Sequence, residues 1–164
     1  MGKILIILIV ALVVGIGWYG FSKKDTSPEL QPTPTSSLVV DKTAKFAIYT
    51  NDTFRVFTAS MYHNLSKDVF IQADSPNIVR VKKEGITWND FFTTLPFKLT
   101  KDCLTTGTKE TFCTNQKGSL KFYLNGDATP DLLNSEIQVG DKALITYGNE
   151  NENQIKEQLN RLNE

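Results

Sequence analysis

Residues 85–95 constrain the fold of this chain more than any other segment. Four large apolar residues recur there at i, i+3, i+4 and i+7, a spacing that places them on one face of a helix: Trp88, Phe91, Phe92 and Leu95. Thr87 and Asp90 stand at the spacing of a capping box, and Pro96 ends the helix. A helix this short and this aromatic has to be buried against a sheet. The segment therefore predicts an α+β domain built around a helix that begins after Thr87 and ends near Leu95.

Runs with strand character lie on both sides of this helix. Residues 46–50 and 54–58 flank Asn51-Asp52, a pair that tolerates the positive φ of a tight turn, so we expect a two-stranded hairpin there. Asn125-Gly126 predicts a second tight turn for the same reason, and residues 74–76 predict a looser one. Further strands are expected at 69–71, 78–81, 119–124 and 142–147.

The order of these elements indicates a β-grasp (ubiquitin-like) fold. A hairpin, a further strand, the helix and a terminal strand would form a mixed sheet of four or five strands with one helix packed across it. Leu132-Leu133 predicts a short helical turn, and a C-terminal amphipathic helix is expected from the spacing of Ile155, Leu159 and Leu162. A small β-sandwich is the alternative, but the buried aromatic helix argues against it.

The N-terminus begins with a long uncharged stretch. Residues 4–21 carry no charged side chain and, as a helix, would extend roughly 27 Å, near the lower limit for crossing a bilayer. Trp18 and Tyr19 suit the aromatic belt at a membrane interface. We expect residues 1–24 to form an uncleaved single-pass membrane anchor. The alternative is a signal peptide with a weak small-residue cleavage site at Gly15 and Gly17.

A proline-rich linker follows the anchor. Residues 25–37 contain Pro28, Pro32 and Pro34 within a Ser/Thr-rich segment that has little to bury, which is typical of an extended spacer. The folded domain is therefore expected over residues 38–164. Because globular domains on proline and threonine stalks usually face outward, we expect this domain outside the cytoplasm, on the cell membrane.

Cys103 and Cys113 are the two cysteines of the chain, and they flank a turn at Gly107 between β-branched residues. Redox-active pairs are usually C-x-x-C at a helix start, and a gap of nine residues across a hairpin does not have that geometry. Closing this loop would stabilise the fold by about 2.8 kcal/mol on the chain-entropy model. We therefore predict a structural disulfide, with free buried thiols and catalysis as weaker alternatives.

His63 is the one histidine in the sequence. It lies near Asp68 and Asp74, but a zinc site needs three or four ligands at defined spacing, and the D-x-D-x-D-G run of a calcium loop is absent. The sequence also has no G-x-S-x-G elbow and no glycine-rich phosphate loop in its folded part. We therefore expect neither a metal nor a cofactor, and we interpret His63 as an exposed loop residue.

Charge bears on the partners of this chain. Lys plus Arg equals Asp plus Glu at 18 each, and no basic stripe is present, so nucleic acid is not an expected partner. Three amphipathic residues suited to protein contacts lie in the least regular segment, 59–76, and are candidate binding residues: Tyr62, His63 and Phe70.

Two N-x-[ST] sequons lie in predicted turns or loops. Asn51 begins the first and Asn64 begins the second. Both asparagines are candidate glycosylation sites if the host glycosylates such triplets.

Three stretches resemble a known family: 85–92, 122–126 and 139–148. The chain is similar there to an uncharacterised family of prokaryotic membrane-anchored domains of archaea and candidate-phylum bacteria, and the likeness extends over roughly residues 45–163. The resemblance implies a membrane-anchored domain rather than a particular reaction. Members carry several histidines before the helix, whereas residues 61–82 keep only His63 here. If those histidines bind a metal in the relatives, this chain has lost that site.

Two classes of function are consistent with the sequence. The first, which we favour, is a non-enzymatic binding module that is tethered to the membrane and contacts a protein partner through a sheet edge or the segment 59–76. The second is an extracytoplasmic enzyme or metal-binding domain that uses the region of His63, which would need a pocket with convergent polar groups.

Overall fold

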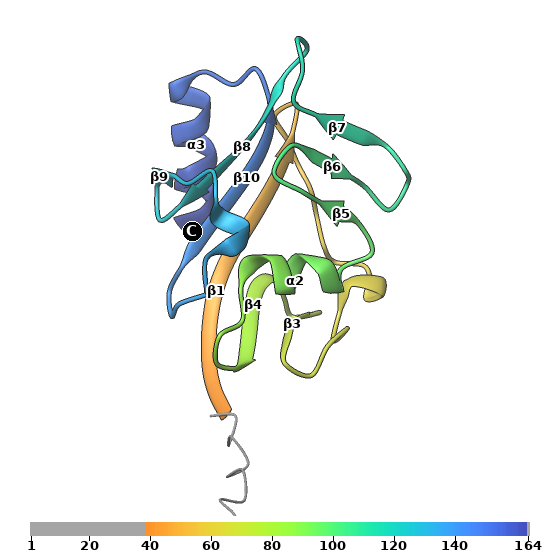
Figure 1. Cartoon of the computed structure of the whole chain (residues 1–164), viewed down its shortest axis with the longest axis vertical. Coiled ribbons are helices and arrows are strands. Elements are labelled where there is room, and N and C mark those ends of the chain that lie inside the picture. The colour runs from red at the N-terminus through yellow and green to blue at the C-terminus, as the bar shows by residue number, and fades with distance from the viewer. Residues whose placement is uncertain (1–38, 164) are drawn as a thin grey trace, which may run out of the picture. The chain divides into compact units, whose positions relative to one another are not determined.

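A long strand in the middle of a mixed sheet organises residues 39–163, the part of the chain that the computed structural model describes (Figure 1). This strand, β1 (Val39–Thr50), pairs in parallel with β10 (Lys142–Gly148), from Lys45 opposite Lys142 to Thr50 opposite Tyr147. Residues 143–147 of β10 are all buried, because helices or strands cover both faces of the sheet here. Along its other edge, β1 is antiparallel to β4 (Ser75–Lys83).

The sheet extends outward from β4 and from β10 in the order β3-β4-β1-β10-β8-β9, and β2 pairs with the end of β1. These outer strands are β2 (Thr53–Phe54), β3 (Val69–Gln72), β8 (Ser119–Leu124) and β9 (Asp127–Ala128). The expectation of four or five strands is wrong, since this sheet has seven. Two of them, β2 and β9, have only two residues each, too few to produce a visible alternation in the sequence.

The expected aromatic helix is α2 (Trp88–Thr94), and it covers one face of the sheet. Thr87 caps it: the Thr87 hydroxyl accepts from the Asp90 amide at 3.1 Å, and the Asp90 carboxylate accepts from the Thr87 amide at 2.8 Å. Phe91 and Phe92 lie against Phe46 of β1, with ring centroids 5.1 and 5.9 Å apart. Next to this helix, η2 (Leu132–Asn134) buries Leu132 in the same core.

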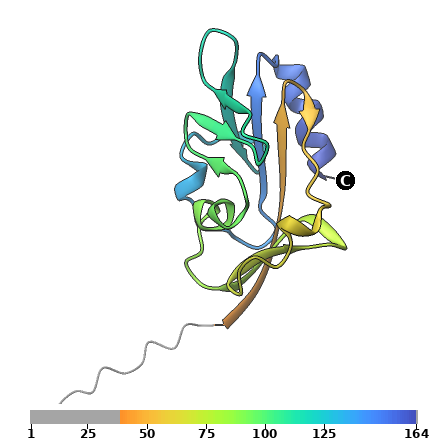
Figure 2. The ribbon, with the colours of Figure 1, turned by 90° about the vertical axis from the view of Figure 1, so that its right-hand side faces the viewer.

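The opposite face of the sheet carries α3 (Glu152–Asn163), the expected C-terminal helix (Figure 2). Side chains alternate along β1, so Phe46 and Ile48 enter the core under α2, whereas Ala47 and Tyr49 enter a second core under α3. Ile155 and Leu162 complete this second core. The domain therefore has two hydrophobic cores, one on each side of the same sheet.

A second, three-stranded sheet lies on the same side as α2 (Figure 2). It consists of β5 (Lys98–Leu99), β6 (Cys103–Thr105) and β7 (Thr111–Cys113). The predicted disulfide is confirmed: Cys103 is directly opposite Cys113, with their Cα atoms 4.1 Å apart. Leu104 and Phe112, the opposed residues one step along the hairpin, are buried in the first core.

The strand expected over 54–58 is wrong beyond Phe54. The Arg55 amide still donates to the Ile48 carbonyl at 2.8 Å, but Phe57 then turns into the core, where its ring centroid lies 5.0 Å from that of Phe46. Farther along, β4 already occupies this edge of β1, since Ile78 pairs with Lys45. After it leaves the edge of β1, the chain forms a single 3-10 turn, η1 (Ser60–Tyr62).

The turn expected over 74–76 lies one residue earlier than predicted. Ser75 already pairs with Gln72 and belongs to β4, so the chain reverses at Ala73 and Asp74. The hairpin turns at Asn51-Asp52 and Asn125-Gly126 have the positive φ values that their sequences indicate.

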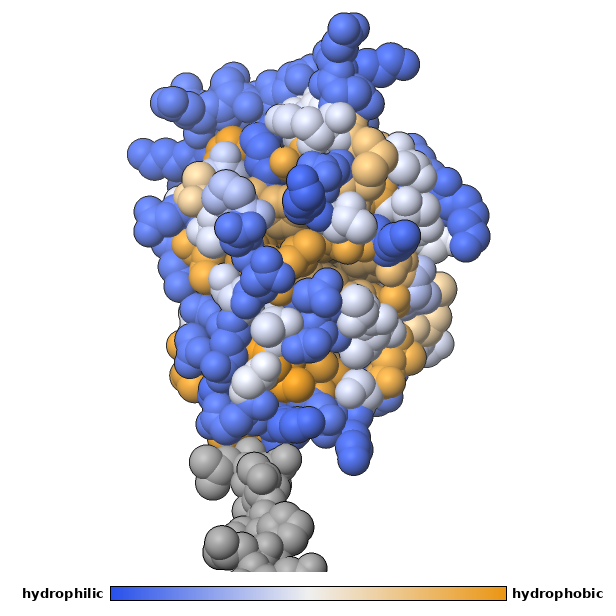
Figure 3. Space-filling view, viewed as in Figure 1, coloured by the Kyte–Doolittle hydropathy of each residue, from blue (hydrophilic) through white to orange (hydrophobic). Residues whose placement is uncertain are grey.

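The predicted anchor at 1–24 and the linker at 25–37 lie outside the described residues. Within residues 39–163, no helix combines the length and apolar character needed to cross a bilayer. These residues belong to one compact unit that contains both cores and both sheets, which are the requirements for folding without the preceding segment. The face drawn in Figure 1 is largely hydrophilic at its surface, with apolar residues visible toward its middle (Figure 3).

Candidate functional site: an apolar cavity beside Tyr62

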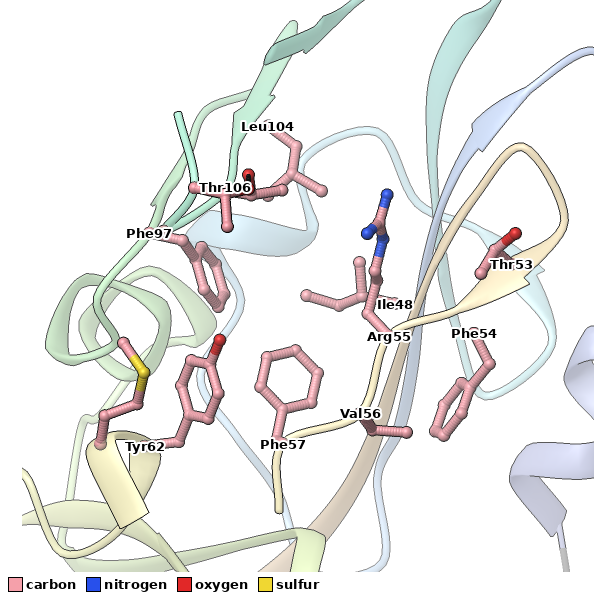
Figure 4. Close-up of a pocket in the computed structure, with 13 residues that line it drawn as sticks. Ile48, Thr53, Phe54, Arg55, Val56, Phe57, Tyr62, Phe97, Leu104 and Thr106 are labelled. Atoms are coloured by element: carbon pink, nitrogen blue, oxygen red, sulfur yellow. Dashed lines mark hydrogen bonds between the residues drawn. The ribbon is translucent and has the colours of Figure 1, made fainter. Parts of the chain in front are cut away.

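A cavity of about 400 Å³ lies between the segment 53–62 and the small sheet β5-β6-β7 (Figure 4). The chain leaves the main sheet after Phe54, and β5, β6 and β7 form a sheet of their own, so the cavity lies between two parts of the domain that do not share one sheet. Cavities of this size hold small molecules or single anchoring side chains of a partner. This is the candidate binding site.

The inner wall of the cavity belongs to the hydrophobic core. Ile48, Phe57 and Leu104 line it and are each less than 5% exposed. Figure 4 shows Phe97 on one side of the hollow, facing Ile48 and Arg55 on the other. A ligand in this space would therefore contact aromatic and branched aliphatic side chains.

The rim of the cavity carries exposed apolar side chains. Val56 is 63% and Met61 is 52% exposed, and they are two of the four large apolar residues exposed in the described part of the chain. A Cβ atom added to Gly107 would lie 4.0 Å from the Met61 methyl and 3.2 Å from the Pro96 carbonyl oxygen. Met61 thus reaches across the mouth toward the β6–β7 turn. Methionine is flexible enough to move aside for a ligand.

Polar groups line the cavity at defined places. The Tyr62 ring packs edge-on against Phe57, with centroids 5.2 Å apart, and its hydroxyl points toward the hollow (Figure 4). Thr106 and Thr108 line the opposite wall, and their hydroxyls are 2.9 Å apart. Arg55 lines the cavity as well, which makes it a mostly apolar site with a few polar groups.

The three candidate binding residues do not form one surface. Tyr62 lines the cavity, and His63 lies next to it, where its Nε2 donates to the Phe57 carbonyl at 2.9 Å. His63 therefore holds the segment that forms one wall of the site. Phe70 points to the opposite face of the sheet from its neighbours Val69 and Ile71, because successive side chains of a strand alternate.

The other predicted residues lie around the site or away from it. Asn51 and Asn64 are exposed and have positive φ, and their glycosylation stays a prediction. The disulfide joins the two strands whose connecting turn forms one side of the cavity mouth. Within residues 39–163, no three His, Cys, Asp or Glu side chains lie close enough together to hold a metal ion.

A second hollow, of about 480 Å³, lies on the α3 side of the sheet. Ala47, Tyr49 and Ile78 line its apolar part, and Lys45 and Arg161 stand at its border. It is adjacent to the end of α3, where Leu162 lines it, and it contains none of the candidate binding residues Tyr62, His63 and Phe70.

Sequence reasoning missed most of the cavity. The sequence predicts a regular strand through Arg55 and Val56, and Phe97 and Leu104 lie more than forty residues later in the chain. A signal was present in the clustering of apolar and basic residues in Phe54-Arg-Val-Phe57, which does not alternate as one buried face requires. The contact of this segment with the small sheet depends on tertiary packing.

Comparison with known proteins gives no relative for this chain: no family model, no curated protein and no solved structure matches it.

Proposed function

We propose that this chain is a membrane-tethered, extracytoplasmic binding module that takes a ligand with an apolar body in the cavity beside Tyr62. The observation that carries the proposal is a cavity of about 400 Å³ that reaches the core and has Val56 and Met61 exposed at its rim. Exposed apolar side chains gathered at a hollow are typical of binding sites.

The properties of this site favour a binding module over an enzyme. His63 is the one histidine of the chain, and its Nε2 is engaged with the Phe57 carbonyl. The cavity residues are mainly apolar, with threonines, Tyr62 and Arg55 as the polar ones. Among the described residues, none of these polar groups is hydrogen-bonded to a histidine or a carboxylate, and Glu110 Oε2 lies 3.7 Å from Arg55 Nη2. Such a set recognises a ligand rather than transforming it.

The β-grasp type of the domain is part of the proposal. Five strands follow the order of that fold, β4-β1-β10-β8-β9, with a parallel pair at the centre. The helix α2 follows the second of these strands along the chain, as in a β-grasp domain. We also infer membership of the uncharacterised membrane-anchored family from the sequence resemblance of residues 85–92, 122–126 and 139–148, which include parts of α2, the β8–β9 turn and β10.

The location outside the cytoplasm is supported by the disulfide. Cytosolic thiols are kept reduced, whereas a structural Cys103–Cys113 bridge is common in oxidising compartments. The uncharged residues 4–21 and the proline-rich residues 25–37 support the anchor and the spacer.

The binding test uses residues 37–164 labelled with ¹⁵N and the uncharged probe 4-phenylbutanamide. Amide signals of Phe57, Leu104 and Thr106 should shift with a common saturating dependence on probe concentration. Thr106→Trp, which puts a large side chain into the cavity, should abolish these shifts, and Thr93→Trp, on the exposed side of α2, should leave them unchanged.

Binding that survives Thr106→Trp in a folded protein would place the ligand elsewhere and would contradict the proposal. Equal melting temperatures of the two variants would show that a loss of binding is not a loss of the fold.

A further inference from the structure

Arg55 is the one charged side chain among the described residues that line the cavity. All others are apolar or carry a neutral hydroxyl, apart from Gly107. A single cation beside an apolar wall disfavours cationic ligands and favours a monoanion with an apolar body. The charge of the cavity therefore selects a class of ligand.

The Arg55 guanidinium is held in position before any ligand arrives. Its Nε donates to the hydroxyl of Thr50, a residue only 1% exposed, over 2.6 Å. The guanidinium carbon also lies 5.3 Å from the centroid of the Phe112 ring, in a cation–π contact. With Nε engaged, the terminal Nη1 and Nη2 groups are the ones left to bind an acid. An immobilised donor loses little entropy on binding.

The carboxylate that now neighbours Arg55 is a weak competitor. Glu110 Oε2 lies 3.7 Å from Arg55 Nη2, beyond good hydrogen-bond distance, and the Glu110 side chain is 57% exposed. Exposed pairs of this kind contribute little to stability. A ligand carboxylate at hydrogen-bond distance, partly shielded from water by the cavity walls, would replace it.

The apolar part of such a ligand has a defined place. Figure 4 shows the Arg55 guanidinium at the end of the hollow nearer Leu104, and the rings of Phe57 and Tyr62 at the other end. A carboxylate at Arg55 therefore leaves the attached apolar group between Ile48 and Phe97. The Tyr62 hydroxyl then stands at the far end of the ligand.

We propose that the cavity recognises a carboxylic acid with an apolar body, bound as the carboxylate by Arg55. This inference rests on the proposed binding function and adds the chemical class of the ligand. The source of the acid is either a small free molecule or the C-terminal carboxylate of a peptide that ends in an apolar residue, since both present the same group.

The test compares 4-phenylbutyrate with 4-phenylbutanamide, which has the same shape but no charge. By ¹⁵N NMR titration of residues 37–164 at pH 7, the acid should bind about tenfold more tightly than the amide, because hydrogen bonds between charged groups are the stronger ones. Arg55→Met should remove this difference, and Arg55→Lys should keep part of it.

Glu110→Gln separates recognition from a structural role of Arg55. Removing the competing carboxylate should strengthen binding of the acid by about twofold to threefold and leave binding of the amide unchanged. Lys98→Met, an exposed lysine of β5 outside the cavity lining, serves as the matched control and should change neither affinity.

The outcomes distinguish the two proposals. If neither probe shifts the cavity signals, the binding function of this cavity is wrong. If both probes bind equally and Arg55→Met changes nothing, the cavity binds ligands but the assignment of an acid is overturned. With the acid preferred, a peptide ending in Ala-Phe that binds more tightly than 4-phenylbutyrate identifies a chain terminus as the source, and weaker binding identifies a free acid.

Discussion

Lys42 joins three parts of the domain through its ammonium group. It lies 2.7 Å from a carboxylate oxygen of Glu84, before α2, and 2.9 Å from one of Glu136, after η2. The same Glu136 oxygen accepts from the Gly85 amide at 3.2 Å. Hydrogen bonds with Glu84 and Glu136 raise the pKa of Lys42, and the bond from Lys42 is the main cause that lowers the pKa of Glu136. The cluster therefore ties the start of α2 to β1.

These pKa shifts predict how the cluster responds to acid. A carboxyl group whose pKa is lowered in the folded state stabilises the fold above its unfolded pKa, near 4.5 for Glu136, and this contribution is lost as the pH falls further. Lys42→Met keeps the aliphatic stem but removes the charge. We expect Lys42→Met to be less stable than the parent at pH 7 and the gap to close below about pH 4.5.

Urea denaturation at a series of pH values measures this gap. The control is Lys83→Met, which changes an exposed lysine of β4, the strand next to β1. Its difference in stability from the parent should not depend on pH in this way. A difference between Lys42→Met and the parent that stays constant down to pH 3 would contradict the assigned role of Glu136.

The helix α2 illustrates how tertiary burial stabilises a short element. Seven residues are too few for a stable isolated helix, so α2 depends on its cap and on its buried face. Trp88 and Phe91 are completely buried, and Phe92 is nearly so. Among the described residues, the indole Nε1 of Trp88 has no hydrogen-bond partner, so the ring stabilises the fold chiefly through its buried apolar area.

We therefore predict that Trp88→Ala and Phe92→Ala each lower the free energy of unfolding by about 3–5 kcal/mol, because each leaves a cavity in the first core. Such losses approach the whole stability of a small domain. Trp88→Phe should cost clearly less, since it keeps most of the apolar area and removes the unpaired N–H. Denaturant unfolding measures all three.

Asn89→Ala, at an exposed position of the same helix, is the control for this series and should change the stability little. Equal stabilities of Trp88→Ala and Asn89→Ala would mean that the helix does not carry the core.

At the scale of the whole domain, the two faces of the sheet are covered differently. Among the described residues, α3 covers one face, whereas α2, η2 and the disulfide-linked small sheet share the other. The cavity opens where the small sheet and the departing segment 53–62 leave space between them. The proposed site therefore depends on the relative positions of the elements that cover this face of the sheet.

The proposed tether predicts the orientation of the whole chain in a membrane. With residues 4–21 as a single span and the N-terminus inside, a cysteine introduced at Ser36 should react with a membrane-impermeant maleimide on intact cells. The native cysteines are both in the disulfide and do not interfere. Labelling that requires cell lysis would place the domain in the cytoplasm and contradict the proposal.

The sequence by itself determined the features that depend on neighbouring residues. The capped helix α2, the turns at Asn51-Asp52 and Asn125-Gly126 and the strand β10 follow from periodicity, capping and positive φ, all of which act over a few residues. The Cys103–Cys113 pair also belongs here, since both cysteines lie in one local hairpin.

Only the tertiary structure decided where the chain leaves the sheet and what it meets there. Phe57 points into the core because it packs there against Phe46, close to the aromatic residues of α2. A longer β2 could not form, because β4 pairs with the same edge of β1. Arg55 then contacts Thr50, five residues before it in the chain, and Phe112, 57 residues after it. Contacts over such separations depend on the register and packing of whole elements, which no local pattern encodes.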